Sequence, residues 1–204
     1  MNIKSLMVGP IGTNCYLLCD EDARACAVVD PGGDAGRVAA AVAETGCAPC
    51  AILLTHGHYD HTGGVAGLQS KWPEVPVYLN RRDVYEDAYT QQLFPPLSGD
   101  VRDYDEGDTV AVGGLTVSVL ATPGHSEGSV TLRCGDVLFC GDTLFAGSCG
   151  RWDLPGGDGD AIKTSLARLY HLEGDYKVCP GHGGASTLER ERQSNGYMRQ
   201  AVAG

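Results

Sequence analysis

The sequence lacks any run of apolar residues that could cross a membrane. None of its apolar stretches reaches the roughly 18 residues that a spanning helix needs. The N-terminal segment, Met1 to Leu6, also lacks the basic and then apolar layout of a secretory signal peptide. We therefore expect a cytoplasmic protein with no membrane partner.

Basic residues are also scarce. The chain has 15 Lys and Arg against 26 Asp and Glu, which gives a formal net charge of -11 at pH 7. Such a balance repels polyanions over most of the surface. We expect a small-molecule substrate and no nucleic-acid partner, in a monomer or small homo-oligomer.

A second C-x-x-C is missing, although the chain has nine cysteines. The one pair, Cys47 and Cys50, follows an expected helix and precedes an expected strand. A redox pair needs its first thiol at a helix N-terminus, and a zinc knuckle needs a second pair. With no export signal, we expect reduced thiols and no role for this pair.

Internal repeats and linker-like stretches are absent too, so residues 1–204 are expected to form one domain. Apolar runs and turn signals predict strands at 3–8, 13–19, 26–29, 51–54, 76–79 and 177–179, and hairpins over 110–120 and 129–140. Helices are predicted from a cap at Asp34 to Thr45, then to about Lys71, and over 81–92, 161–171 and 186–199.

Residues 81–108 are the hardest to interpret. After the charged helix predicted for 81–92 comes Leu93-Phe94-Pro95-Pro96-Leu97, an apolar loop stiffened by proline. It is either a surface connection or a wall of the substrate pocket, because specificity often resides in such loops.

The most informative stretch is Thr55-His56-Gly57-His58-Tyr59-Asp60-His61, which follows the strand predicted for 51–54. It places four metal-ligand side chains in six positions, in a loop that leaves the C-terminal end of a strand. Ligand sites of open α/β layers collect there. Buried without a cation, these side chains would need many separate hydrogen-bond partners. The pattern therefore predicts a metal site.

This His-x-His-x-Asp-His stretch resembles the signature of the metallo-β-lactamase superfamily. Three later segments extend the resemblance over nearly the whole chain, in the expected order: 122–129 with His125, 141–145 with Asp142, and 180–183 with His182. The resemblance implies an α/β (α+β) fold. Its four layers form an αβ/βα sandwich of two mixed sheets with helices outside, and the site lies where loops of both sheets meet.

The resemblance also implies seven ligands for two divalent metals: His56, His58 and His125 for the first, Asp60, His61 and His182 for the second, and Asp142 as a bridge. Zinc is expected first, with iron or manganese as alternatives, because no thiolate is among the ligands. A metal-bridging hydroxide would be the nucleophile. Asp60 would be a ligand that also handles protons.

Among branches of the family, the loop 145–158 and the tail 181–192 resemble the single-domain glyoxalase II-like hydrolases. We expect no counterpart of the C-terminal helical domain that helps glyoxalase II bind glutathione. The resemblance thus implies hydrolysis of a small thioester such as S-(2-hydroxyacyl)glutathione. Arg151 is expected to contact a substrate carboxylate, or else to form an ion pair with Asp153 or Asp158.

Two other activities remain open. Persulfide dioxygenases resemble glyoxalase II and share a Cys-Gly-Arg like residues 149–151, but bind one iron through two His and one Asp. A phosphodiesterase or nuclease of the same fold is a further alternative, which the acidic composition opposes.

Other polar residues have simpler interpretations. Asp30 either belongs to the turn of residues 30–33 or orients a ligand His. His171 ends a predicted helix and is expected to be structural or exposed. Neither Cys140 nor Cys149 is expected to take part in catalysis.

Overall fold

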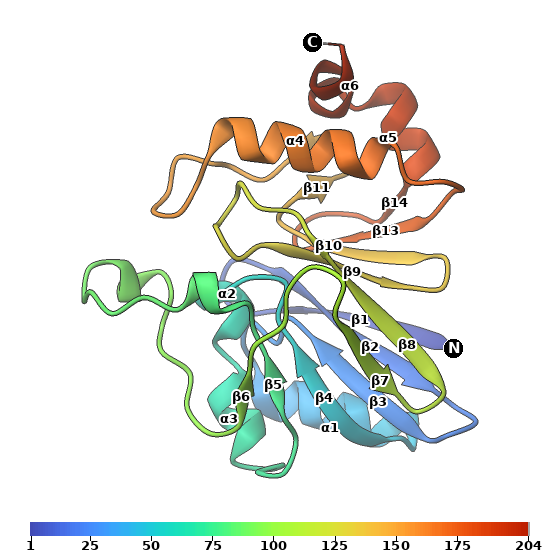
Figure 1. The fold of residues 1–204 in the computed structure, drawn as a ribbon. Coiled ribbons are helices and arrows are strands. Elements are labelled where there is room, and N and C mark those ends of the chain that lie inside the picture. Colours follow the sequence, from blue (N-terminus) through green and yellow to red (C-terminus); the bar gives the residue numbers. More distant parts are fainter. Residues whose placement is uncertain (204) are drawn as a thin grey trace.

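The computed structural model describes residues 1–203, which form two six-stranded sheets packed face to face with helices on their outer sides (Figure 1). Both sheets are mixed, as predicted. No helix within these residues is long and apolar enough to span a membrane.

The first sheet follows chain order. Its strands are β1 (Asn2–Val8), β2 (Thr13–Asp20), β3 (Ala25–Val29), β4 (Ala48–Leu53), β5 (Val77–Tyr78) and β6 (Val101–Arg102). The first three pair antiparallel, and β3 to β6 pair parallel. The parallel part places the ends of β3 and β4 at one edge, where loops can carry ligands.

The second sheet has the strand order β14-β13-β10-β9-β8-β7. The bounds are β7 (Thr109–Val112), β8 (Leu115–Ala121), β9 (Val130–Cys134), β10 (Val137–Gly141), β13 (Lys177–Pro180) and β14 (Ser186–Thr187). Only β10 and β13 pair parallel, so their C-terminal ends lie side by side. A separate ribbon joins β11 (Leu144–Phe145) to β12 (Ser148–Cys149). Both predicted hairpins are confirmed.

Alternate side chains of the first sheet enter two different cores. Leu18, Val29 and Leu53 point to the second sheet and pack in the central core. Their neighbours Leu17, Val28 and Ile52 pack in an outer core that includes residues of α1 (Ala35–Thr45) and α3 (Val65–Gln69). Strands buried on both faces are apolar throughout, which explains their continuous apolar runs in the sequence.

The outer face of the second sheet is covered by α4 (Gly159–Tyr170), α5 (Leu188–Ser194) and α6 (Gly196–Val202) (Figure 1). Ile162, Leu166 and Leu169 of α4 are buried, as its helical pattern predicts. Asp158 caps this helix, because its carboxylate accepts the N–H groups of Asp160 and Ala161. His171 is the residue that ends it.

The helix predicted to run to Lys71 is interrupted. It forms α2 (Tyr59–Thr62) and α3, separated by Gly63 and Gly64. The Gly64 N–H donates to the carbonyl of Pro31 at 2.7 Å. A Cβ on Gly64 would lie 2.6 Å from that carbonyl oxygen. The β3–α1 turn therefore lies against the backbone of Gly64, and a continuous helix does not form here.

Three other helix predictions were wrong in part. Residues 81–92 form only two 3-10 turns, η1 (Arg81–Asp83) and η2 (Thr90–Gln92). The closing helix is broken at Asn195, whose side chain accepts the N–H groups of Tyr197 and Met198 and so starts α6. Asp34 precedes α1 in a left-handed conformation, and its carboxylate accepts the N–H of Gly9 instead of capping the helix.

Candidate metal centre

Four of the seven predicted ligands lie on the connection between β4 and α2. His56 and His58 occupy the loop, and Asp60 and His61 lie in α2. A backbone near φ -60° and ψ 146° at His58 ends the loop and starts the helix. The Asp60 carboxylate and the His61 imidazole thus turn toward the space at the sheet edge, where all four side chains are buried.

The other three ligands come from the second sheet. His125 lies between β8 and β9, Asp142 follows β10, and His182 follows β13. Because Gly141 pairs with Pro180, Asp142 and His182 leave adjacent parallel strands at the same edge. Residues separated by more than 120 positions are therefore brought to one point: His182 Nε2 lies 3.1 Å from Asp60 Oδ2.

The seven side chains form three overlapping groups whose ligand atoms lie within 4.8 Å of one another: His56, His58 and His125; His56, His61 and Asp142; Asp60, His61 and His182. The first and third match the two predicted triads. Asp142 lies between them, with a carboxylate oxygen 3.3 Å from His61 Nε2 and the other 3.6 Å from His125 Nε2.

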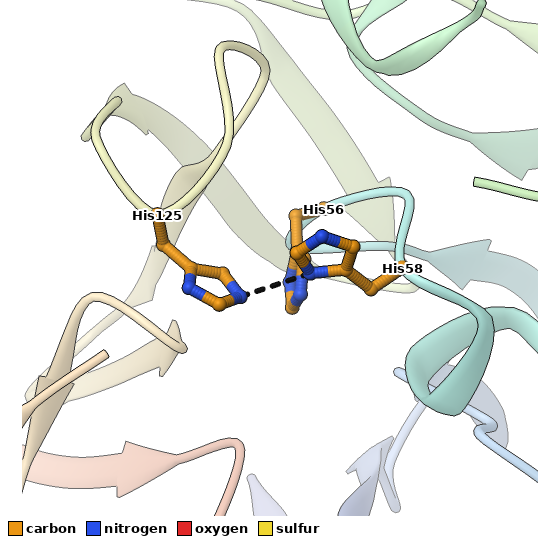
Figure 2. A group of neighbouring side chains, drawn as sticks. All are labelled: His56, His58 and His125. Atoms are coloured by element: carbon orange, nitrogen blue, oxygen red, sulfur yellow. Dashed lines mark hydrogen bonds between the residues drawn. The ribbon is translucent and has the colours of Figure 1, made fainter. Parts of the chain in front are cut away.

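Figure 2 shows the first triad, in which the His125 loop faces His56 and His58 across a small space; His58 Nδ1 and His125 Nε2 are 2.9 Å apart. Within residues 1–203, the buried atoms His56 Nε2, His58 Nε2 and Asp142 Oδ1 have no hydrogen-bond partner. Buried polar atoms are costly when unpaired. A cation bound among them would satisfy them, so the donor set fits a metal site.

The pKa values of the imidazoles shift in opposite directions. Burial lowers the pKa of His56 well below its usual value, and the neighbouring imidazoles lower it further. Burial likewise lowers the pKa of His58 to about 3. Burial also lowers the pKa of His61, but the carboxylates of Asp142 and Asp30 raise it more, so that it lies well above the usual value. The hydrogen bond to Asp60 raises the pKa of His182. Metal ligation would displace such protons.

Asp30 lies beside His61, a predicted ligand, as one of the two interpretations of this residue expects. Its carboxylate accepts the N–H of Thr55 at 2.8 Å and the Thr55 hydroxyl at 2.7 Å. One oxygen lies 3.0 Å from His61 Nδ1. His125 is held in a similar way, with Nδ1 2.6 Å from the carbonyl of Arg151. In both cases an oxygen atom lies beside Nδ1, while Nε2 faces other predicted ligand atoms.

Asp83, which joins the two ligand loops, was not identified from the sequence. This buried carboxylate accepts the N–H of Gly57 at 2.8 Å and the N–H of Gly128 at 2.7 Å. It also accepts the Ser126 hydroxyl at 2.7 Å. It thereby connects the His56–His58 loop to the His125 loop. An isolated Asp in a charged segment carries no sequence signal for such a role.

A cavity of about 470 Å³ opens above the ligands. Ile11, Tyr59, Leu93, Phe145, Leu154 and Arg151 line it beside His58, Asp60, His125, Asp142 and His182. The apolar loop after residue 92 thus contributes Leu93 to the wall. Arg151 reaches the cavity, but its guanidinium forms a two-point ion pair with Asp153 at 2.7 and 2.8 Å.

The cysteines stand apart from this site. All nine are free thiols, and none belongs to the ligand groups found within residues 1–203. Cys140 is buried on the outer face of the second sheet. Cys149 is half-buried in β12 and does not line the metal cavity.

Two curated relatives match the full length of the chain. A probable metallo-hydrolase of Bacillus subtilis, YqgX, is 35% identical over 97% of this chain and 98% of its own. The hydroxyacylglutathione hydrolase GloC of Haemophilus influenzae is 32% identical, again over 97% and 98%.

Solved structures share the fold. The BLEG-1 B3 metallo-beta-lactamase superposes with a TM-score of 0.86 at 34% identity, covering 97% of this chain and 99% of that one. TTHA1623 in a di-iron-bound form gives 0.79 at 38%, covering 95% and 99%. ETHE1 from Myxococcus xanthus gives 0.82 at 29%, covering 96% and 84%. The family model described as the metallo-beta-lactamase superfamily matches residues 8–182. With this match and the clustered His and Asp residues, the chain belongs to the metallo-β-lactamase superfamily.

Proposed function

We propose that this protein is a metal-dependent hydrolase of small thioesters with two divalent cations at the site. The observation that carries the proposal is the pair of ligand triads that share the space around Asp142 at the floor of an open cavity. Each metal would have three ligands of its own and would share Asp142, which leaves coordination positions open for water and substrate, as catalytic sites require.

The residues have distinct roles. His56, His58 and His125 would hold one cation, Asp60, His61 and His182 the other, and Asp142 both. Bound divalent cations lower the pKa of water and polarise a carbonyl. Asp60 is oriented for ligation because its Oδ2 accepts the Thr13 hydroxyl at 3.1 Å. A thiol leaves readily, since its pKa is about 8.5, so a thioester needs little acid assistance.

Zinc is the first metal to test. Nitrogen and oxygen ligands without thiolate also accept iron and manganese. The di-iron-bound form of TTHA1623 supports including iron in the test. The name of the Haemophilus relative makes S-lactoylglutathione the first substrate to assay. Arg151 would contact a carboxylate of such a substrate after leaving Asp153.

A second candidate is a persulfide dioxygenase with one iron held by two His and one Asp. The group His56, His61 and Asp142 has that composition. The full second triad, including His182, favours the two-metal hydrolase instead.

The test is the metal content of protein purified without chelator, followed by thioester hydrolysis monitored with a thiol-reactive dye. Two metals per chain with thioester turnover are expected. One iron per chain, no thioester turnover and oxygen uptake with a persulfide would replace the hydrolase with the dioxygenase.

A further inference from the structure

The wall of the metal cavity is largely apolar. Its apolar residues come from separate segments: Ile11 from the β1–β2 turn, Tyr59 from α2, Leu93 from the segment after η2, Phe145 from β11, and Leu154 from the loop before α4. Ile11 and Tyr59 are 54% and 42% exposed. Exposed apolar side chains gathered at a cavity mark a binding surface.

This wall is held in place. The Tyr59 N–H donates to the carbonyl of Leu93 at 2.7 Å, which joins two of the apolar residues through the backbone. Behind Leu93, the Phe94 ring is buried. Its centroid lies 4.3 Å from the centroid of the His58 ring and 4.6 Å from that of the Tyr85 ring. The apolar surface is therefore part of the folded site and is ready before substrate binds.

Positive charge is scarce at the same cavity. Of the residues that line it, Arg151 is the one Lys or Arg, and Asp153 already neutralises its guanidinium through two contacts. The chain as a whole carries a net charge of -11. Away from the proposed metal ions at the cavity floor, a thiol carrier with two carboxylates, such as glutathione, would meet one cationic side chain on the wall, already paired with Asp153, on a chain of negative net charge.

Building on the function proposed above, we propose that the preferred substrates are thioesters with an apolar acyl group on an uncharged thiol carrier, and that glutathione thioesters are poorer substrates. Water adds to the acyl carbon, the C–S bond breaks as a C–O bond forms, and the products are a carboxylic acid and a free thiol. No oxidant or second substrate is needed.

The experiment compares four thioesters on the metal-loaded enzyme: lactoyl and hexanoyl groups, each on glutathione and on N-acetylcysteamine. We expect kcat/KM to rise about tenfold from lactoyl to hexanoyl, because several CH₂ groups become buried. We expect kcat/KM to rise by a further factor of about three when the carrier changes from glutathione to N-acetylcysteamine. This second gain should shrink at high salt, because salt screens the charge of the carrier.

Two substitutions assign the preference to this wall. Ile11→Lys adds a cation at the rim of the cavity. It should shift the ratio of kcat/KM between N-acetylcysteamine and glutathione thioesters toward the glutathione thioesters by about threefold. Asp153→Asn frees Arg151 and should shift it the same way. Val84→Lys is the matched control, because Val84 is an exposed apolar residue, 60% accessible, that does not line the cavity. It should leave the ratio unchanged.

The outcomes separate this inference from the hydrolase proposal. If S-lactoylglutathione is the best of the four substrates, the inference is overturned and the thioesterase stands. If none of the four is cleaved, the thioesterase itself fails, and the inference with it. An equal shift in Val84→Lys and Ile11→Lys would show that overall charge, not the cavity wall, sets the preference, which also overturns the inference.

Discussion

At the scale of single residues, the site depends on glycines that let the ligands approach one another. Gly181 lies between the end of β13 and His182. A Cβ built on it would lie 2.1 Å from Asp142 Oδ1 and 2.6 Å from His61 Cε1. Any side chain here would displace Asp142, the predicted bridging ligand, and His61 of the second triad, so the absence of a side chain is part of the site.

We therefore expect Gly181→Ala to lower the affinity for the second metal by at least about tenfold, because both ligands must move. Metal titration against a chromophoric chelator measures the affinity. Gly184→Ala is the control, since a Cβ at Gly184 meets no atom within 4 Å. Equal metal affinity in the two variants would contradict the packing argument.

At the scale of elements, the short turn η1 connects loops that belong to different sheets. Its Asp83 accepts hydrogen bonds from Gly57 on the first sheet's loop and from Ser126 and Gly128 on the second sheet's loop. Burial raises the pKa of this carboxyl, and the hydrogen bonds oppose that effect. Residues 81–92 do not form a regular helix, because these contacts determine the conformation around Asp83.

Asp83→Ala should lower the free energy of unfolding by about 3 kcal/mol, because it leaves buried donors without an acceptor. It should also weaken metal binding by about tenfold to a hundredfold, since both His loops lose their connection. Denaturant unfolding and chelator competition measure the two effects. Glu86→Ala, at an exposed position of the same segment, should change neither. Metal binding that survives Asp83→Ala intact would limit Asp83 to a role in stability.

At the scale of the whole molecule, the metal centre joins the two sheets. Each predicted triad takes side chains from loops of both sheets, and β10 and β13 deliver Asp142 and His182 to the edge where β4 ends. A ligand that binds only the folded state stabilises that state by mass action. Bound metal should therefore stabilise the packing of one sheet on the other.

Removing the metal should lower the melting temperature. Occupancy at 100 times Kd contributes about 2.7 kcal/mol, which for a chain of this size corresponds to about 5–10 °C. Calorimetry with and without chelator measures the shift. A variant that carries both His56→Ala and His61→Ala should show no chelator effect. If the chelator destabilises this variant as much as the parent, the metal that matters lies elsewhere.

The local sequence predicted the elements whose signals are short in range. Apolar runs located the strands, and turn signals located the hairpins over 110–120 and 129–140. The end predicted for the first helix at Thr45 is confirmed. The spacing of residues 56–61 predicted four clustered ligands, because one loop and one helical turn bring them together whatever the rest of the chain does.

Only the tertiary structure decided features that join distant segments. The role of Asp83, the pairing of Arg151 with Asp153 at the cavity, and the meeting of Ile11, Tyr59 and Leu93 in one wall follow from how the two sheets pack. The sequence by itself thus determined the fold and predicted the metal-ligand residues through local patterns and family resemblance. The packing decided the shape and charge of the substrate cavity, because contacts between distant residues leave no local pattern.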